Sequence, residues 1–181
     1  MPNPKRIYLA GPEVFFPAAE HQAIVAEKKR LLMEYGLEGV DPLDTELAFS
    51  DSEAKFRRGH RIYRANRDLM DSCDAIIANL TPFRGISADP GTVFEVGYMI
   101  GQGKRAFGFT LDSRCYRDRA GATEHDEQGH AIEDFEMRDN LMIEGGIYGS
   151  GGQLFVAEEP GEHRFFSAEL FRRCARALAS A

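Results

Sequence analysis

Cysteine, positive charge and long hydrophobic runs are all scarce in this chain of 181 residues. The three cysteines, Cys73, Cys115 and Cys174, form no CxxC pair and have no histidine at metal-ligand spacing, which argues against a disulfide framework and a structural zinc site. No apolar run reaches the roughly 20 residues that span a membrane, and the N-terminus lacks the apolar stretch of a signal peptide. We therefore expect a soluble, cytoplasmic protein with reduced thiols, no bound metal and no membrane partner.

The charge balance is negative, because 22 Lys and Arg residues stand against 29 Asp and Glu residues, a formal net charge of −7. Nucleic acids and anionic membranes bind clustered positive charge, so we expect neither as a partner. Hydrophobic residues make up 43% of the chain, which is too many for a disordered protein. The length fits one domain over residues 1–181. A small, neutral or metabolite-sized ligand is compatible with this composition.

Short apolar runs alternate with helical patterns along the chain. The expected strands are residues 6–10, 37–40, 74–80, 105–110 and 153–157, and the expected helices are residues 18–35, 56–73, 89–102 and 167–179. Residues 112–133 are polar and indicate a long loop. The alternation predicts an α/β fold: a single-domain, doubly wound (flavodoxin- or Rossmann-like) parallel five-stranded sheet with helices on both faces. In such a fold a ligand binds beyond the carboxyl ends of the strands.

Glu95 is the only charged residue between Val93 and Ile100. A helix that is apolar nearly all round is typically buried, and a lone carboxylate inside it loses hydration. Glu95 lies within two turns of the expected helix N-terminus, where the helix dipole favours its ionised form. A desolvated but charged carboxylate is a good nucleophile, so Glu95 is a candidate catalytic residue. A structural carboxylate paired with a buried arginine is the alternative.

Asp89 precedes Pro90 and Gly91, a pattern typical of a helix N-cap followed by proline at the first helical position. It also places a second carboxyl group near Glu95. Glycosyl transfer needs two carboxyl groups in different surroundings, one to attack the anomeric carbon and one to manage the proton of the leaving group. A cap and a catalytic acid are compatible roles for one residue.

Other local patterns are weaker indicators of function. The glycine-bearing segment 101–104 follows a helix and lacks the full spacing of a phosphate loop, so it indicates a helix end. Residues 149–152 indicate a flexible turn. The histidines are scattered and none pairs with a Ser or Cys nucleophile, which argues against a triad hydrolase.

Taken in order, five segments resemble the nucleoside 2-deoxyribosyltransferase family. They are IYLAGP (7–12), DPLD (41–44), IYRAN running into CDAIIANL (62–80), PFRG through DPGT to EVGY (82–98), and EDF with RDNLM (133–142). The resemblance implies that Glu95 is the nucleophile that forms a covalent deoxyribosyl ester, that Asp89 is the acid–base residue at the nucleobase, and that the Tyr8 hydroxyl steadies the nucleophile. It implies a 2′-deoxynucleoside and a free nucleobase as substrates, and no cofactor.

The resemblance implies further substrate contacts. Asn140 and Met142 match positions that a neighbouring subunit lends to the active site, so we expect a homo-oligomer, at least a dimer, in which the Asn140 region completes the site of the next subunit. Gly11 and Asp44 match substrate-side positions at the ends of the first two strands, and Glu46 falls where relatives place a side chain that reads the base.

One helix position departs from the family pattern. Several relatives carry an aspartate where this chain has Asn66, and nearby Asp68 is the other residue that fits this role. An asparagine hydrogen-bonds but does not titrate, so the two alternatives differ in chemistry.

Three other functions compete with base exchange. A 2′-deoxynucleoside 5′-monophosphate N-glycosidase shares the fold and the glutamate, but its relatives bind phosphate with a Ser- and Arg-bearing loop after the first strand, where this chain has Glu13, Phe15 and Phe16. A non-catalytic nucleoside sensor would not need Glu95 together with Asp89. A Rossmann oxidoreductase is disfavoured because no GxGxxG opens a predicted helix.

Overall fold

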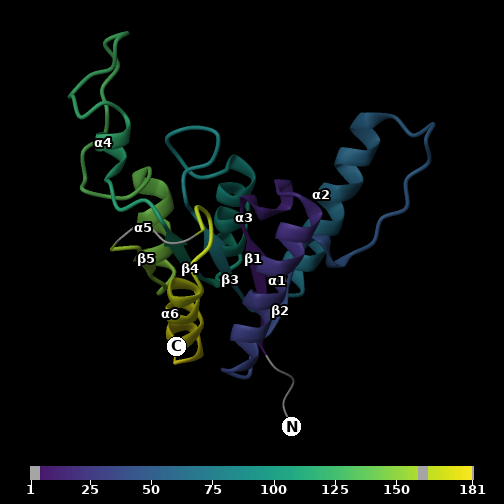
Figure 1. The fold of residues 1–181 in the computed structure, drawn as a ribbon. Helices are drawn as coiled ribbons and strands as arrows, with labels where there is room; N and C mark the ends of the chain where they lie inside the picture. Colours follow the sequence, from purple (N-terminus) through teal and green to yellow (C-terminus); the bar gives the residue numbers. More distant parts are fainter. Residues whose placement is uncertain (1–4, 159–162, 181) are drawn as a thin grey trace.

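The computed structural model describes residues 5–158 and 163–180, so the predicted domain, 1–181, extends beyond the described residues. Five strands form one parallel sheet in the order β2-β1-β3-β4-β5 (Figure 1). Their bounds are β1 Arg6–Ala10, β2 Glu38–Val40, β3 Ala75–Asn79, β4 Arg105–Thr110 and β5 Leu154–Val156. The predicted α/β fold with five parallel strands is confirmed. The strand order reverses between β1 and β3, which makes the carboxyl ends of these two strands the expected ligand crevice.

Helices cover both faces of the sheet. They are α1 Ala18–Met33, α2 Lys55–Asp71, α3 Pro90–Gly101, α4 Tyr116–Arg119, α5 Leu141–Gly149 and α6 Ala168–Ala179, with short 3-10 turns η1 Pro12–Phe15 and η2 Pro42–Asp44. Helices α1 and α6 pack on one face, and α2, α3 and α5 contribute to the core on the other. Within the described residues, no helix is long and apolar enough to cross a membrane.

Alternation along β1 decides which side chain meets which helix layer. Ile7 and Leu9 belong to the core beneath α1 and α6, whereas Tyr8 and Ala10 belong to the core beneath α2, α3 and α5. Successive side chains of a strand point to opposite faces. Tyr8 therefore points toward the layer that contains Glu95.

Two elements were not predicted. The polar segment 112–133 contains the short helix α4, and α5 follows directly after Asn140, whose side chain caps it by accepting a hydrogen bond from the Met142 amide at 3.0 Å. Helix α5 carries three glycines, Gly145, Gly146 and Gly149, which have low helix propensity. Its buried stripe is only Ile143 and Ile147, so packing against α3 stabilises it instead of propensity.

The expectation that α3 is buried nearly all round was wrong. Phe94 is 51% exposed, and Gly91 and Gly97 are exposed as well. Helix α2 is likewise buried only toward its C-terminal end, where Met70 is its one buried residue. The N-terminal half of α2 extends beyond the sheet edge (Figure 1), so its apolar side chains have no layer to pack against within one chain.

Candidate active site

The central contact of the site joins β1 to α3. The Tyr8 hydroxyl donates a hydrogen bond of 2.7 Å to Oε1 of Glu95. Tyr8 is fully buried, and its pKa is raised well above the usual value by burial and by the neighbouring Glu95 carboxylate. The phenol therefore stays protonated and serves as a fixed hydrogen-bond donor that holds one oxygen of Glu95.

Glu95 titrates far from a normal glutamate. Its pKa is raised from 4.5 to about 7: burial raises it most, the carboxylates of Asp89 and Asp41 also raise it, and the hydrogen bond from Tyr8 partly offsets them. A carboxyl group with this pKa is partly ionised near neutral pH and poorly hydrated. That combination suits nucleophilic attack by its carboxylate form.

Asp41 is a third carboxyl group of the site, and the sequence prediction did not single it out. It lies at the end of β2, is 4% exposed, and its pKa is raised by burial. The Leu43 amide donates to Asp41 at 3.0 Å, and His21 lies 3.3 Å away. Its charge acts on both Tyr8 and Glu95. The only sequence signal was its place at the start of the DPLD motif.

Asp89 has the position predicted for it at the start of α3. Its Oδ2 accepts hydrogen bonds from the Thr92 amide at 3.0 Å and from the Thr92 hydroxyl at 3.3 Å, so it is the N-cap. The residue is 9% exposed. Among the described residues, Oδ1 makes no hydrogen bond, which leaves one oxygen of the cap for other contacts.

The turn after β1 depends on a glycine and a buried ion pair. A Cβ at Gly11 would lie 1.9 Å from the Glu13 carboxylate, so no side chain fits there. Glu13 accepts hydrogen bonds from Lys28 at 2.6 Å and from Asn79 at 2.8 Å. Glu13, Lys28 and Asn79 are all buried. Gly11 thus has a structural reason to be glycine that is separate from any substrate contact.

Asp44 and Glu46 lie at and just beyond η2, which follows the edge strand β2. Both carboxylate oxygens of Asp44 accept from Lys29, at 2.6 and 2.7 Å, and one also accepts from the Asp41 amide. Glu46 is exposed. The hydrogen bonds of Asp44 fix the η2 turn to α1.

The two helix positions proposed for the same role differ in their surroundings. Asp68 is exposed and pairs with neighbouring Arg67 at 2.7 Å, whereas Asn66 is partly buried. Asn66 is therefore the better placed of the two to face the interior of the fold.

Asn140 and Met142 lie at the start of α5. Met142 is 74% exposed. The Asn140 side chain caps α5 and donates to Glu133 at 2.9 Å.

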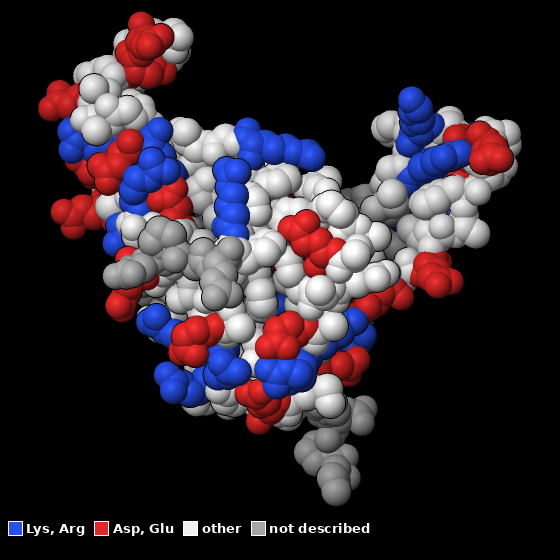
Figure 2. Space-filling view, in the orientation of Figure 1, with Lys and Arg blue, Asp and Glu red and all other residues white. Residues whose placement is uncertain are grey.

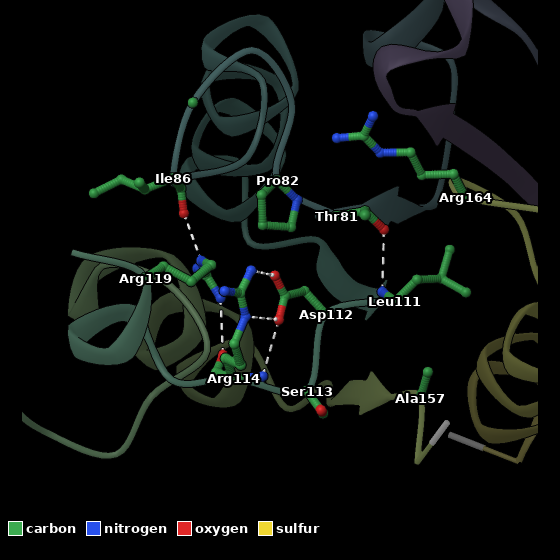
Figure 3. Close-up of a pocket in the computed structure, with 11 residues that line it drawn as sticks. Thr81, Pro82, Ile86, Leu111, Asp112, Ser113, Arg114, Arg119, Ala157 and Arg164 are labelled. Carbon is green, nitrogen blue, oxygen red and sulfur yellow. Dashed lines mark hydrogen bonds and ion pairs between the residues drawn. The ribbon is translucent and has the colours of Figure 1, made fainter. Parts of the chain in front are cut away.

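Flat side chains gather where β1 and β3 end. The rings of Phe15 and Phe83 are nearly parallel, with centroids 5.6 Å apart, and the Arg84 guanidinium lies 4.7 and 4.8 Å from them. Nucleobases stack on surfaces of this kind. A separate cavity of about 510 Å³ lies beyond β3, β4 and β5 (Figure 3), and neither Tyr8 nor Glu95 lines it.

Charge on the surface is mixed. On the face shown in Figure 2, acidic and basic side chains are interspersed outside the grey residues, and no broad patch of one sign covers it. Within the described part of the chain, no three His, Cys, Asp or Glu residues are grouped so that they could hold a metal ion.

Comparisons with known proteins show the family and the fold to which this chain is similar. The model of the family described as nucleoside 2-deoxyribosyltransferase matches residues 7–142. An uncharacterised protein of Schizosaccharomyces pombe is 33% identical, over 96% of this chain and 88% of its own length. A 2-deoxyribosyltransferase from Leishmania mexicana has a TM-score of 0.65 at 34% identity, covering 77% of this chain and 85% of that chain.

A CMP N-glycosidase from Clostridium botulinum has a TM-score of 0.50 at 14% identity, covering 93% of this chain and 96% of that chain. At that identity the likeness concerns the fold. The family match spans most of the chain and includes both Tyr8 and Glu95. The chain belongs to the nucleoside 2-deoxyribosyltransferase family.

Proposed function

We propose that this protein transfers the 2-deoxyribosyl group of a 2′-deoxynucleoside to a second nucleobase, by a retaining double displacement. The family comprises enzymes of glycosyl transfer and hydrolysis. The observation that carries the proposal is the 2.7 Å hydrogen bond from Tyr8 to Glu95, in a site where the pKa of Glu95 is raised to about 7.

Each step of the proposed reaction is assigned to a residue of this chain. Glu95 attacks C1′, the bond from C1′ to the base nitrogen breaks, and its electron pair stays on the nitrogen, which takes a proton from Asp89. A second base then attacks C1′ of the ester, gives its N–H proton to Asp89, and releases the Glu95 carboxylate. Two inversions at C1′ retain the β configuration.

The remaining crevice residues receive binding roles. We assign sugar orientation to Asn66 instead of Asp68, because Asp68 is exposed and paired with Arg67. Asp44 and Glu46 face the base side, and Gly11 lets the β1 turn pass close to the substrate. No metal or cofactor takes part.

One assay tests the function directly. Purified protein is mixed with deoxyinosine and free adenine, and the products are separated by chromatography. We expect deoxyadenosine and hypoxanthine in equal amounts. Hypoxanthine without a new nucleoside would instead support the N-glycosidase, which releases the sugar to water. No product with any donor and base would contradict both enzymes and favour a nucleoside sensor.

Replacing Tyr8 with phenylalanine should shift the pH dependence of the reaction. The Tyr8 hydrogen bond lowers the pKa of Glu95, so its loss raises that pKa and moves the acidic limb of kcat/KM to higher pH. The rate at pH 7 should fall about 10-fold. Tyr35→Phe, at the far end of α1, is the control. An unchanged limb would show that Tyr8 does not act on the nucleophile.

We further propose that the active site is completed by a neighbouring copy of this chain. Large apolar side chains are exposed on the adjoining helices α3 and α5: Phe94 at 51%, Met142 at 74% and Tyr148 at 53%. Exposed apolar clusters of this kind mark interaction surfaces. In the oligomer, Asn140 and Met142 of one subunit contact the deoxyribose in the site of the next.

Mixed oligomers test this sharing. Glu95→Ala and Asn140→Ala chains, each inactive alone, should regain about a quarter of the wild-type activity when refolded together in equal amounts, because mixed dimers hold one intact site. Mixing Glu95→Ala with Asp89→Asn is the control, since both residues belong to the same half-site and no intact site forms. Activity no higher than that control would contradict the shared site.

A further inference from the structure

A buried carboxylate that the proposed mechanism does not use lies between two parts of the site. Asp139 is 2% exposed. Its Oδ1 accepts hydrogen bonds from the Ser87 hydroxyl and, at 2.8 Å, from the Asn140 amide. Its Oδ2 accepts from the Ala88 amide at 2.8 Å. Asp139 thus bonds directly to the residues that precede Asp89 and to the residue that caps α5.

Arg119 completes the cluster from α4. Its guanidinium lies 3.8 Å from Asp139, and both side chains are 3% exposed. It also donates to the Ile86 carbonyl at 2.6 Å, to the Arg114 carbonyl at 2.8 Å, and to the Arg138 carbonyl. Figure 3 shows Arg119 reaching the Ile86 end of the loop at the rim of the cavity. The pair therefore ties three segments together through charge-assisted hydrogen bonds.

The loop between β3 and α3 has few other anchors near Asp89. One backbone hydrogen bond, from the Phe83 amide to the Ser87 carbonyl at 3.0 Å, closes it on itself. Ile86, Ser87 and Ala88 are each bonded to Arg119 or Asp139. The backbone that enters Asp89 is held chiefly by this pair.

We propose that Asp139, with Arg119, is a positioning residue that sets the place of Asp89 in its own subunit and of Asn140 at the start of α5. This inference rests on the proposed function, in which Asp89 protonates the leaving base and Asn140 contacts deoxyribose. One carboxylate then serves two active sites, because Asn140 belongs to the site of the neighbouring subunit.

Asp139→Asn is the sharpest probe, because an amide has one acceptor oxygen where the carboxylate has two. With its oxygen on the Oδ1 side, the asparagine keeps Ser87 and Asn140 but turns its NH₂ toward the Ala88 amide. With its oxygen on the Oδ2 side, it keeps Ala88 and faces the Asn140 amide with NH₂. Either orientation releases one of the two segments. Asp126→Asn is the matched control, since a single oxygen of Asp126 accepts from the backbone amides of Gln128 and His130, so an asparagine there can keep both bonds.

The first readout is the dependence of the rate on the leaving group. For a natural deoxynucleoside, whose base must be protonated as it leaves, Asp139→Asn should lower kcat about 10- to 100-fold. For a 2-deoxyriboside with a 4-nitrophenolate leaving group, which needs no proton, the first step should slow less than about threefold. Asp126→Asn should leave both rates unchanged. An equal loss with both donors would overturn the positioning of Asp89, and no loss with either donor would overturn the positioning role as a whole.

The second readout does not depend on activity. Hydrogen exchange of individual amides should speed up at Ala88, at Asn140 or at both in Asp139→Asn, and should stay as in wild type at both amides in Asp126→Asn. If the wild-type protein neither transfers nor hydrolyses any donor, the proposed function fails, and this measurement still tests whether Asp139 anchors both segments. Exchange at Ala88 and Asn140 equal to wild type would refute the anchoring.

Discussion

Glu95→Gln is expected to lower the rate of base exchange by at least about 10³-fold, because an amide oxygen cannot form the ester with C1′. The substitution keeps the shape of the side chain and an acceptor for the Tyr8 hydroxyl. The loss should therefore appear with every donor, including the 4-nitrophenolate one. Steady-state rates and trapping of the glycosyl–enzyme by mass spectrometry measure it. Activity within tenfold of wild type would reject Glu95 as the nucleophile, taking ~10-fold as the limit of an indirect effect.

The same variant should be more stable than wild type at alkaline pH. The pKa of Glu95 is raised from 4.5 to about 7 in the folded protein, chiefly by burial, so the folded state binds this proton more tightly than the unfolded chain. Wild-type stability is therefore highest below the unfolded pKa and is lost as pH rises through about 7. The glutamine side chain of the variant carries no charge at any pH, and the gain at pH 8 should be about 3 kcal/mol.

Urea unfolding of wild type and Glu95→Gln across pH 4 to 8 checks this linkage. The two proteins should converge at the acidic end and separate as the pH rises. Glu169→Gln, an exposed change on α6, should follow wild type throughout. If the stabilities of wild type and Glu95→Gln changed in parallel with pH, ionising Glu95 would cost no more free energy in the folded protein than in the unfolded chain.

Lys28→Met is expected to remove about 3–5 kcal/mol of stability, because it leaves the buried Glu13 carboxylate without its cation. Lys28 is 2% exposed, lies 2.6 Å from Glu13, and stands 5.6 and 5.8 Å from the ring centres of Phe109 and Phe171. The Asn79 amide would then be the only side-chain donor to Glu13 among the described residues. The β1 turn should loosen as the pair breaks.

The double variant Glu13→Gln with Lys28→Met separates charge from packing. It removes both charges together, so it should recover more than half of the loss. Lys29→Met is the matched control on the same helix: its pair with Asp44 is about one third exposed, and its loss should stay below about 1 kcal/mol. A single Lys28 variant as stable as the Lys29 control would show that the buried pair contributes nothing.

The strands were predictable because each is a short apolar run between turn residues. Residues 6–10 and 105–110 match β1 and β4 in full, and the other three strands differ by one residue at one or both ends. Helix α5 was missed because its three glycines conceal the spacing of Ile143 and Ile147. The exposure of Phe94 was missed because an apolar helix surface has the same sequence pattern whether its own chain or another one covers it.

Candidate residues of the site could be chosen from the sequence, but the contacts between them could not. Glu95 stands out as a lone charge, and Asp89 as a cap, from the local sequence. The contact between Tyr8 and Glu95 joins positions 87 residues apart, and only the fold brings them together. Asp139 lies in the RDNLM segment, but nothing near it in the sequence distinguishes a buried aspartate from an exposed one. Its burial follows from the convergence of α4, the β3–α3 loop and the start of α5.

The anchors of the β3–α3 loop are unevenly distributed, which bears on how this enzyme can be re-engineered. Residues 82–85 include Phe83 and Arg84, which stack with Phe15 where β1 and β3 end. Residues 86–88 are instead bonded to Arg119 and Asp139. Insertions or randomised sequence at 82–85 should change which molecules fit the crevice and leave Asp89, the proposed catalytic acid, in place. The same changes at 86–88 should disable the enzyme whatever base is offered. Libraries aimed at new acceptor bases belong in the first segment and should leave the second intact.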